Sequence, residues 1–90
     1  MNEIKIEKPD QAQLEKMGIF SWPIWEKEAS TFSWHYGEKE TCYILEGKVT
    51  VEPKDGKAVE INPGDLVVFP AGMGCVWKIS QKIKKHYNFG

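Results

Sequence analysis

The chain has 90 residues, enough for one domain with a single modest core. Apolar residues make up 41% and charged residues 28% of it, which excludes a disordered or membrane-spanning chain. With 13 acidic and 12 basic residues the net charge is −1, which disfavours nucleic acids and membranes as partners. Every base is a lysine, so no guanidinium is available to grip an anion with two hydrogen bonds.

The N-terminal part predicts a short strand and then a short helix. Residues 4–8 alternate apolar and polar side chains, and Pro9 confines such a strand to a sheet edge. Asp10 is a suitable N-cap for a helix over residues 11–17, and Gly18 is suited to the C′ position. This is the only helix that the sequence predicts.

The rest of the chain alternates between strands and Gly- or Pro-containing turns. Aromatic residues dominate the stretch 20–36, which we interpret as strand broken at Pro23 and at Ser30 and Thr31. Further strands are expected at 41–45, 48–52, 58–61, 66–69, 74–79 and 83–89, with a hairpin turn at Glu46 and Gly47. About eight or nine short strands with so little helix predict an all-β sandwich or barrel. We expect one domain over residues 1–90, in which residues 1–20 form the N-terminal strand and helix and residues 21–90 form the barrel.

Two motifs connect this pattern with a known fold. His35, Glu40 and Gly47 have the spacing His-x4-Glu-x6-Gly. A second set has the spacing Gly-x5-Pro-x-Gly-x2-Cys and consists of Gly64, Pro70, Gly72 and Cys75. Together they resemble the two motifs of the cupins, small jelly-roll barrels. The segments 22–28, 40–47, 64–67, 69–70 and 85–87 resemble the one-domain cupins related to ureidoglycine aminohydrolase and the ethanolamine-utilisation cupins.

The resemblance implies a metal site that this chain fills only in part. Metal-binding cupins offer His-x-His and Glu from the first motif and His from the second, and here Ser33 and Cys75 stand at two of the histidine positions. His35, Glu40 and Cys75 are the remaining candidate ligands, and a thiolate favours zinc over iron. The sequence favours no tightly bound metal and leaves a divalent ion open.

Strand alternation predicts the pocket lining. Side chains two residues apart share a face, so Glu40 groups with Cys42, Cys75 with Trp77, and Ser33 with His35. We expect these six side chains to line one pocket, with Glu40, His35 and Cys75 as the candidate catalytic groups.

Each residue also has a structural interpretation. Both cysteines suit a core as small apolar fillers, and a strand shift of one residue would move His35 to the surface. The four tryptophans fit core packing or a subunit interface better than a substrate-stacking platform. His86 fits a satisfied polar group, and the lysines at 82, 84 and 85 fit a solvated edge strand. Glu40 is the strongest pocket candidate, because a carboxylate buried without a partner is costly.

The functional expectation is a cytoplasmic small-molecule-binding cupin. Two cysteines are too few for a disulfide framework, which favours a reducing compartment. The resemblance implies a small polar, nitrogen-containing metabolite as ligand, with acid–base or metal-assisted hydrolase or isomerase chemistry left open. The alternatives are a non-catalytic ligand sensor or accessory barrel, and a structural module whose aromatic face only holds a dimer. The aromatic surface of residues 20–36 leads us to expect a homodimer.

Overall fold

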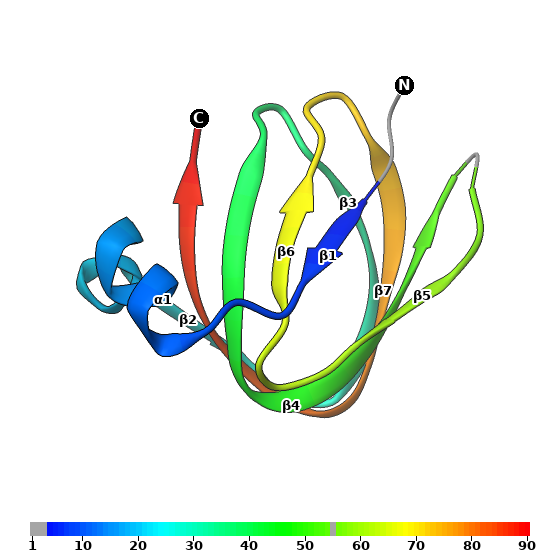
Figure 1. The fold of residues 1–90 in the computed structure, drawn as a ribbon. Helices are drawn as coiled ribbons and strands as arrows, with labels where there is room; N and C mark the ends of the chain where they lie inside the picture. Colours follow the sequence, from blue (N-terminus) through cyan, green and yellow to red (C-terminus); the bar gives the residue numbers. More distant parts are fainter. Residues whose placement is uncertain (1–3, 55) are drawn as a thin grey trace.

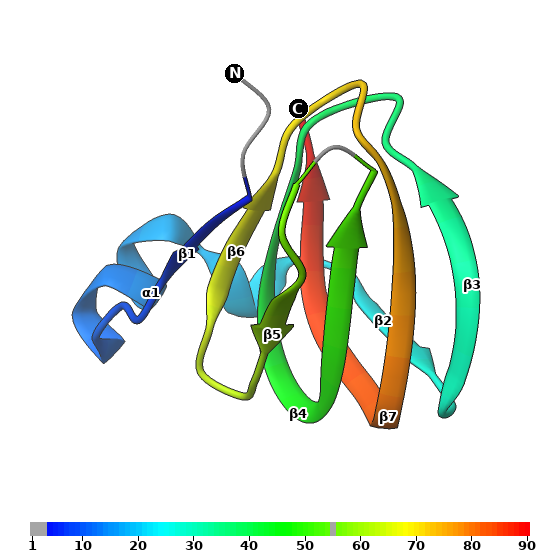
Figure 2. The same ribbon diagram turned by 90° about the vertical axis from the view of Figure 1, so that its right-hand side faces the viewer.

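The computed structural model describes residues 4–54 and 56–90. Within them an antiparallel barrel is flanked by one short helix, as Figures 1 and 2 show. The elements are β1 (Lys5–Glu7), α1 (Gln11–Met17), the 3-10 turn η1 (Ile19–Ser21), β2 (Ile24–Lys27), β3 (Ser30–His35), β4 (Glu40–Pro53), β5 (Val59–Ile61), β6 (Leu66–Phe69) and β7 (Gly74–Phe89). The all-β expectation is confirmed.

Two long, bent strands organise the barrel. β4 pairs along most of its length with β7, and both curve through the base of the barrel in Figure 1. The two halves of β4 pair on their other side with different partners, β6 at Glu40–Tyr43 and β5 at Val49–Val51. β7 does the same with β3 and β2. The loops 36–39 and 70–73 and the C-terminus therefore meet at one end of the barrel (Figures 1 and 2).

Gly47 lies within a continuous strand, which corrects the expected hairpin turn at this point. A register irregularity surrounds it, and its φ of 99° suits glycine. A β-carbon on Gly47 would lie 2.1 Å from the carbonyl oxygen of Lys82 on β7. The same merging joins the strands expected at 74–79 and 83–89, so the described residues form seven strands rather than eight or nine.

The N-terminal helix forms as the sequence predicts. The Asp10 carboxylate accepts a hydrogen bond from the backbone N–H of Gln13 at 2.9 Å, and Gly18 ends the helix with a φ of 69°. The helix carries Leu14 to a small apolar cluster with Ile19 and Leu66 outside the barrel. None of the described helices is long and apolar enough to cross a membrane.

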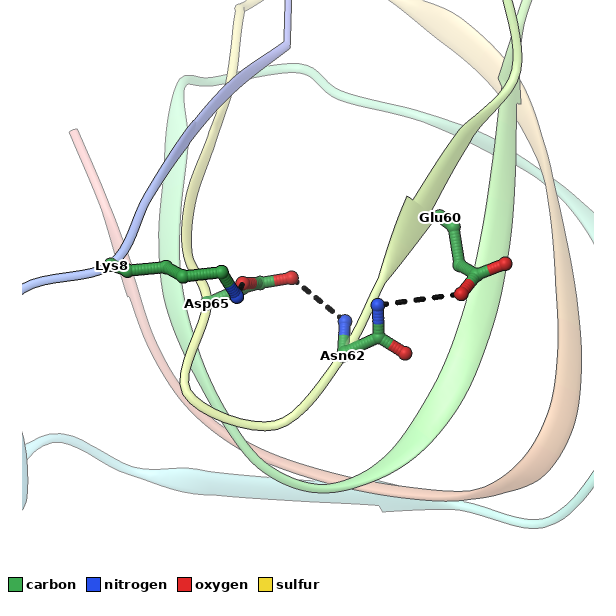
Figure 3. A network of polar contacts seen from close by, with 4 residues as sticks. All are labelled: Lys8, Glu60, Asn62 and Asp65. Carbon is green, nitrogen blue, oxygen red and sulfur yellow. Dashed lines mark hydrogen bonds and ion pairs between the residues drawn. The ribbon is translucent and has the colours of Figure 1, made fainter.

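A polar network holds the N-terminal segment to the turn between β5 and β6 (Figure 3). The buried carboxylate of Asp65 accepts from the backbone N–H of Asn62 at 2.8 Å and from the Lys8 ammonium at 2.5 Å. The Asn62 side chain in turn contacts Glu60 at 3.5 Å. Asp65 thus stabilises a turn of the second sequence motif, which is a structural role.

The main core fills the barrel with aliphatic and aromatic side chains, while several large apolar residues remain exposed. Phe20, Ile24 and Trp34 are about half exposed in the segment for which the sequence predicts a subunit interface. The structure describes a single chain, so the homodimer stays a prediction.

Candidate functional site

An aromatic cavity of about 230 Å³ opens inside the barrel. Seven of its lining side chains are aromatic and two are charged. They are Trp25, Phe32, Trp34, Tyr36, Glu40, Trp77, Lys85, Tyr87 and Phe89. β2, β3, β4 and β7 all contribute, because inward-facing residues of neighbouring strands converge when a sheet closes. The cavity is large enough for a small organic molecule and offers mostly ring surfaces to it.

The two charged groups of the cavity form a buried ion pair. The ammonium of Lys85 lies 2.5 Å from Oε2 of Glu40, and the two side chains are only 6% and 5% exposed. Glu40 is the first residue of β4, and its backbone pairs with Phe69 on one side and Phe89 on the other. Such burial is tolerated because each charge compensates the other.

Indole rings complete the surroundings of the Lys85 ammonium. Its Nζ atom lies 5.0 Å from the ring centroid of Trp25 and 4.7 Å from that of Trp77, within the range of cation–π attraction. The two indoles meet edge to face at 6.0 Å. The ammonium is therefore held by one carboxylate and two ring faces.

A second group of aromatic contacts packs the side chains of the cavity wall against one another. Phe32 stacks on Trp77 with ring centroids 6.1 Å apart, and Tyr36 stacks on Phe69 at 4.8 Å. The indole N–H of Trp77 donates a hydrogen bond of 3.1 Å to the Tyr36 hydroxyl. Burial raises the pKa of Tyr36, with a smaller contribution from the Glu40 charge, so this hydroxyl stays protonated. Trp77 therefore contacts Phe32 through its ring face, Tyr36 through its N–H and Trp25 edge to face.

The structure places Ser33 and His35 outside this cavity, which corrects their expected position. Both are exposed, while Phe32 and Trp34 of the same strand line the cavity. The sequence analysis assigned the inward face of β3 to the wrong alternate residues. A one-residue shift in this assignment moves every side chain of the strand to its other face. The larger apolar surface of the rings favours turning Phe32 and Trp34, rather than Ser33 and His35, toward the interior, although Trp34 stays about half exposed. His35 therefore does not pair with Glu40, whose partner is Lys85.

The remaining expected residues face the barrel interior. Glu40 and Trp77 line the cavity. Cys42 and Cys75 are buried in the core and are not among the described residues that line the cavity. Burial raises the pKa of Cys42 to about 12, against a partly compensating effect of the Lys85 charge. Burial also raises the pKa of Cys75. Both thiols are protonated near neutral pH, and the roles of Glu40, His35 and Cys75 in catalysis stay predictions.

The Cys42 thiol is expected to make the protein less stable at alkaline pH. Its pKa is about 12 in the folded chain and 9.0 in an ordinary thiol. The stabilisation is therefore complete below pH 9 and is lost as the pH rises toward 12, because the unfolded chain ionises first. Thermal unfolding of wild type and Cys42→Val between pH 7 and pH 11 measures this. The wild type should lose more stability than the variant, and parallel curves would contradict the expectation.

The cupin-type metal set does not fit this site. Among residues 4–54 and 56–90, no three His, Cys, Asp or Glu side chains form a group that could hold a metal ion. His35 is exposed on the other face of β3, and the Glu40 carboxylate already has a cation as its partner. The ligand set of His35, Glu40 and Cys75 expected from the sequence is not assembled, and we derive no chemistry through a metal.

Sequence reasoning missed Lys85 and most of the aromatic wall. Lys85 was assigned with its neighbours to a solvated edge, but β7 is an inner strand and this side chain is buried. A signal was present, because Cys75, Trp77, Ile79, Ile83 and Lys85 at odd-numbered positions of β7 are buried, and only Gln81 interrupts this series. Continued alternation from Trp77 places Lys85 and Tyr87 in the same interior.

His86, on the opposite face, donates through Nδ1 to the carbonyl oxygen of Trp22 at 2.9 Å, as expected of a satisfied polar group.

The small antiparallel barrel, with two long bent strands paired along most of their length, has the architecture of a cupin. The EutQ-like cupin domain model matches residues 14–87, and the chain belongs to this family. No curated protein matches it significantly.

Solved structures agree with this assignment. A DUF861 family protein from Thermotoga maritima is 53% identical with a TM-score of 0.96, and the match covers 98% of this chain and 100% of that one. The EutQ protein of Clostridium difficile is 23% identical with a TM-score of 0.66 over 73% of this chain and 52% of that one. A predicted oxalate decarboxylase from Thermotoga maritima is 20% identical with a TM-score of 0.57 over 98% and 80% of the two chains. The last two show the fold alone.

Proposed function

We propose that the protein binds a small, planar, uncharged molecule that carries an amide or ureide group. The buried pair of Glu40 and Lys85 at the wall of an aromatic cavity carries this proposal. A carboxylate accepts hydrogen bonds and an ammonium donates them, so the pair presents one acceptor beside one donor. An amide or ureide offers the complementary N–H and C=O in one plane.

The aromatic wall supports the same class of ligand. Planar groups gain from stacking on rings or from edge-to-face contact with them, and this cavity has seven rings on its wall. The net charge of Glu40 and Lys85, the two charged groups of the cavity wall, is zero, so neither an anion nor a cation finds an uncompensated partner there. The implied nitrogen-containing metabolite therefore fits best in an uncharged form.

Benzamide is a suitable first probe, because it combines one ring with one primary amide. It should bind in isothermal titration calorimetry and raise the melting temperature, since a ligand of the folded state stabilises that state. N,N-Dimethylbenzamide keeps the ring and the carbonyl but has no N–H, and it should bind more weakly. Equal affinity for both compounds, or binding of neither benzamide nor N-methylurea, would argue against the proposal.

A pair of variants localises the binding. Trp34 lines the cavity and is 49% exposed, so Trp34→Ala should leave the fold intact and weaken benzamide binding by about 3- to 10-fold. Phe20 is also 49% exposed but is not part of the cavity wall, so Phe20→Ala is the matched control and should keep the wild-type affinity. Equal losses in both variants would place the ligand elsewhere.

A further inference from the structure

The surroundings of the Lys85 ammonium are those of a receptor for organic cations. Its Nζ atom has the Glu40 carboxylate at 2.5 Å and the indole faces of Trp25 and Trp77 at 5.0 and 4.7 Å. One carboxylate and two electron-rich ring faces are the groups that bind alkylammonium and quaternary ammonium ligands. In this protein the cation that occupies them comes from the chain itself.

This internal occupation is nearly complete. The Lys85 side chain is 6% exposed, so its charge has little water left and depends on these partners. Trp25, Trp77 and Glu40 all line the cavity as well, so the same groups face an entering ligand. A cationic ligand would have to displace the tethered ammonium or stand beside it at close range, where like charges repel strongly in a poorly solvated site.

We propose that Lys85 is the specificity-determining residue of the cavity, because its ammonium fills a cation site from within and restricts the cavity to uncharged ligands. The inference rests on the proposed function only in treating this cavity as the ligand site. It goes further in assigning the exclusion of cations to one side chain. Removal of that side chain should then create a cation site that the wild type lacks.

The test uses Lys85→Ala and the fragment that this substitution removes. Three methylene groups and the ammonium are lost beyond Cβ, and n-propylammonium replaces them closely. In isothermal titration calorimetry the variant should bind n-propylammonium and tetramethylammonium at least roughly tenfold more tightly than the wild type, equivalent to about 1.4 kcal/mol. The uncharged n-propanol should show no such gain.

Lys84→Ala is the matched control. This neighbouring lysine points away from the cavity and lies 4.0 Å from Glu46, with 36% of its side chain exposed. Its removal should leave cation binding at the wild-type level. A folded Lys85→Ala protein that binds both cations no better than wild type overturns the proposal.

A double variant covers the case in which Lys85→Ala does not fold with its orphaned carboxylate. Glu40→Gln combined with Lys85→Ala removes both charges and leaves the indole faces of Trp25 and Trp77 open to the cavity. Tetramethylammonium should still bind it more tightly than wild type, and a folded double variant without this gain also overturns the proposal. The result is independent of benzamide, since wild-type protein that binds no amide contradicts the proposed function but not the gain of cation binding.

Discussion

Lys85→Met is expected to destabilise the protein by about 3–5 kcal/mol, because it leaves the buried Glu40 carboxylate without its counter-charge. For a domain of this size the melting temperature should fall by at least roughly 12 °C. The double variant Glu40→Leu/Lys85→Met should recover most of the loss, because an apolar pair needs no compensation. Urea unfolding of wild type, Glu40→Leu, Lys85→Met and the double variant measures the coupling free energy between the two side chains.

Lys78→Met provides the control on the same strand. Lys78 also pairs with a carboxylate of β4, Glu52 at 2.8 Å, but both side chains are more than 40% exposed. Solvent screens this pair, so the variant should stay within about 0.5 kcal/mol of wild type. Similar losses for Lys85→Met and Lys78→Met would mean that burial of the Glu40–Lys85 pair has no special weight in stability.

Gly47→Ala should also be strongly destabilising, by about 3 kcal/mol or more. The new β-carbon would lie 2.1 Å from the Lys82 carbonyl oxygen and 2.7 Å from its carbonyl carbon, so β4 and β7 would have to separate. The φ of 99° adds backbone strain for any residue with a β-carbon. Chemical unfolding of the purified variant measures the loss, and reduced soluble expression is expected with it.

Gly64→Ala separates the two causes. Gly64 has a similar φ of 90°, but no atom beyond its own chain neighbours would lie within 4 Å of its new β-carbon. This variant should therefore show backbone strain alone, about 1–2 kcal/mol. If both variants lose the same stability, the contact with Lys82 contributes nothing and Gly47 is required only for its backbone conformation.

Local sequence patterns were sufficient to predict the fold class and the N-terminal helix. The Asp10 cap and the Gly18 terminator bound the helix at the predicted residues, since both act within one helical turn. Alternation also placed Glu40, Cys42, Cys75 and Trp77 toward the interior. Each of these inferences needs only neighbours a few positions apart along the chain.

Which side chains contact one another depends instead on long-range strand pairing, which local patterns do not reveal. The face of β3 depends on its pairing with β7, where Trp34 lies opposite Cys75, and this register put the aromatic residues inside and His35 outside. The turn expected at Gly47 became a bend because β7 continues alongside β4 on both sides of it. Lys85 pairs with Glu40, which lies 45 positions earlier in the sequence. A buried charge is stable only beside its partner, and barrel closure, which joins strands distant in sequence, is what supplies that partner.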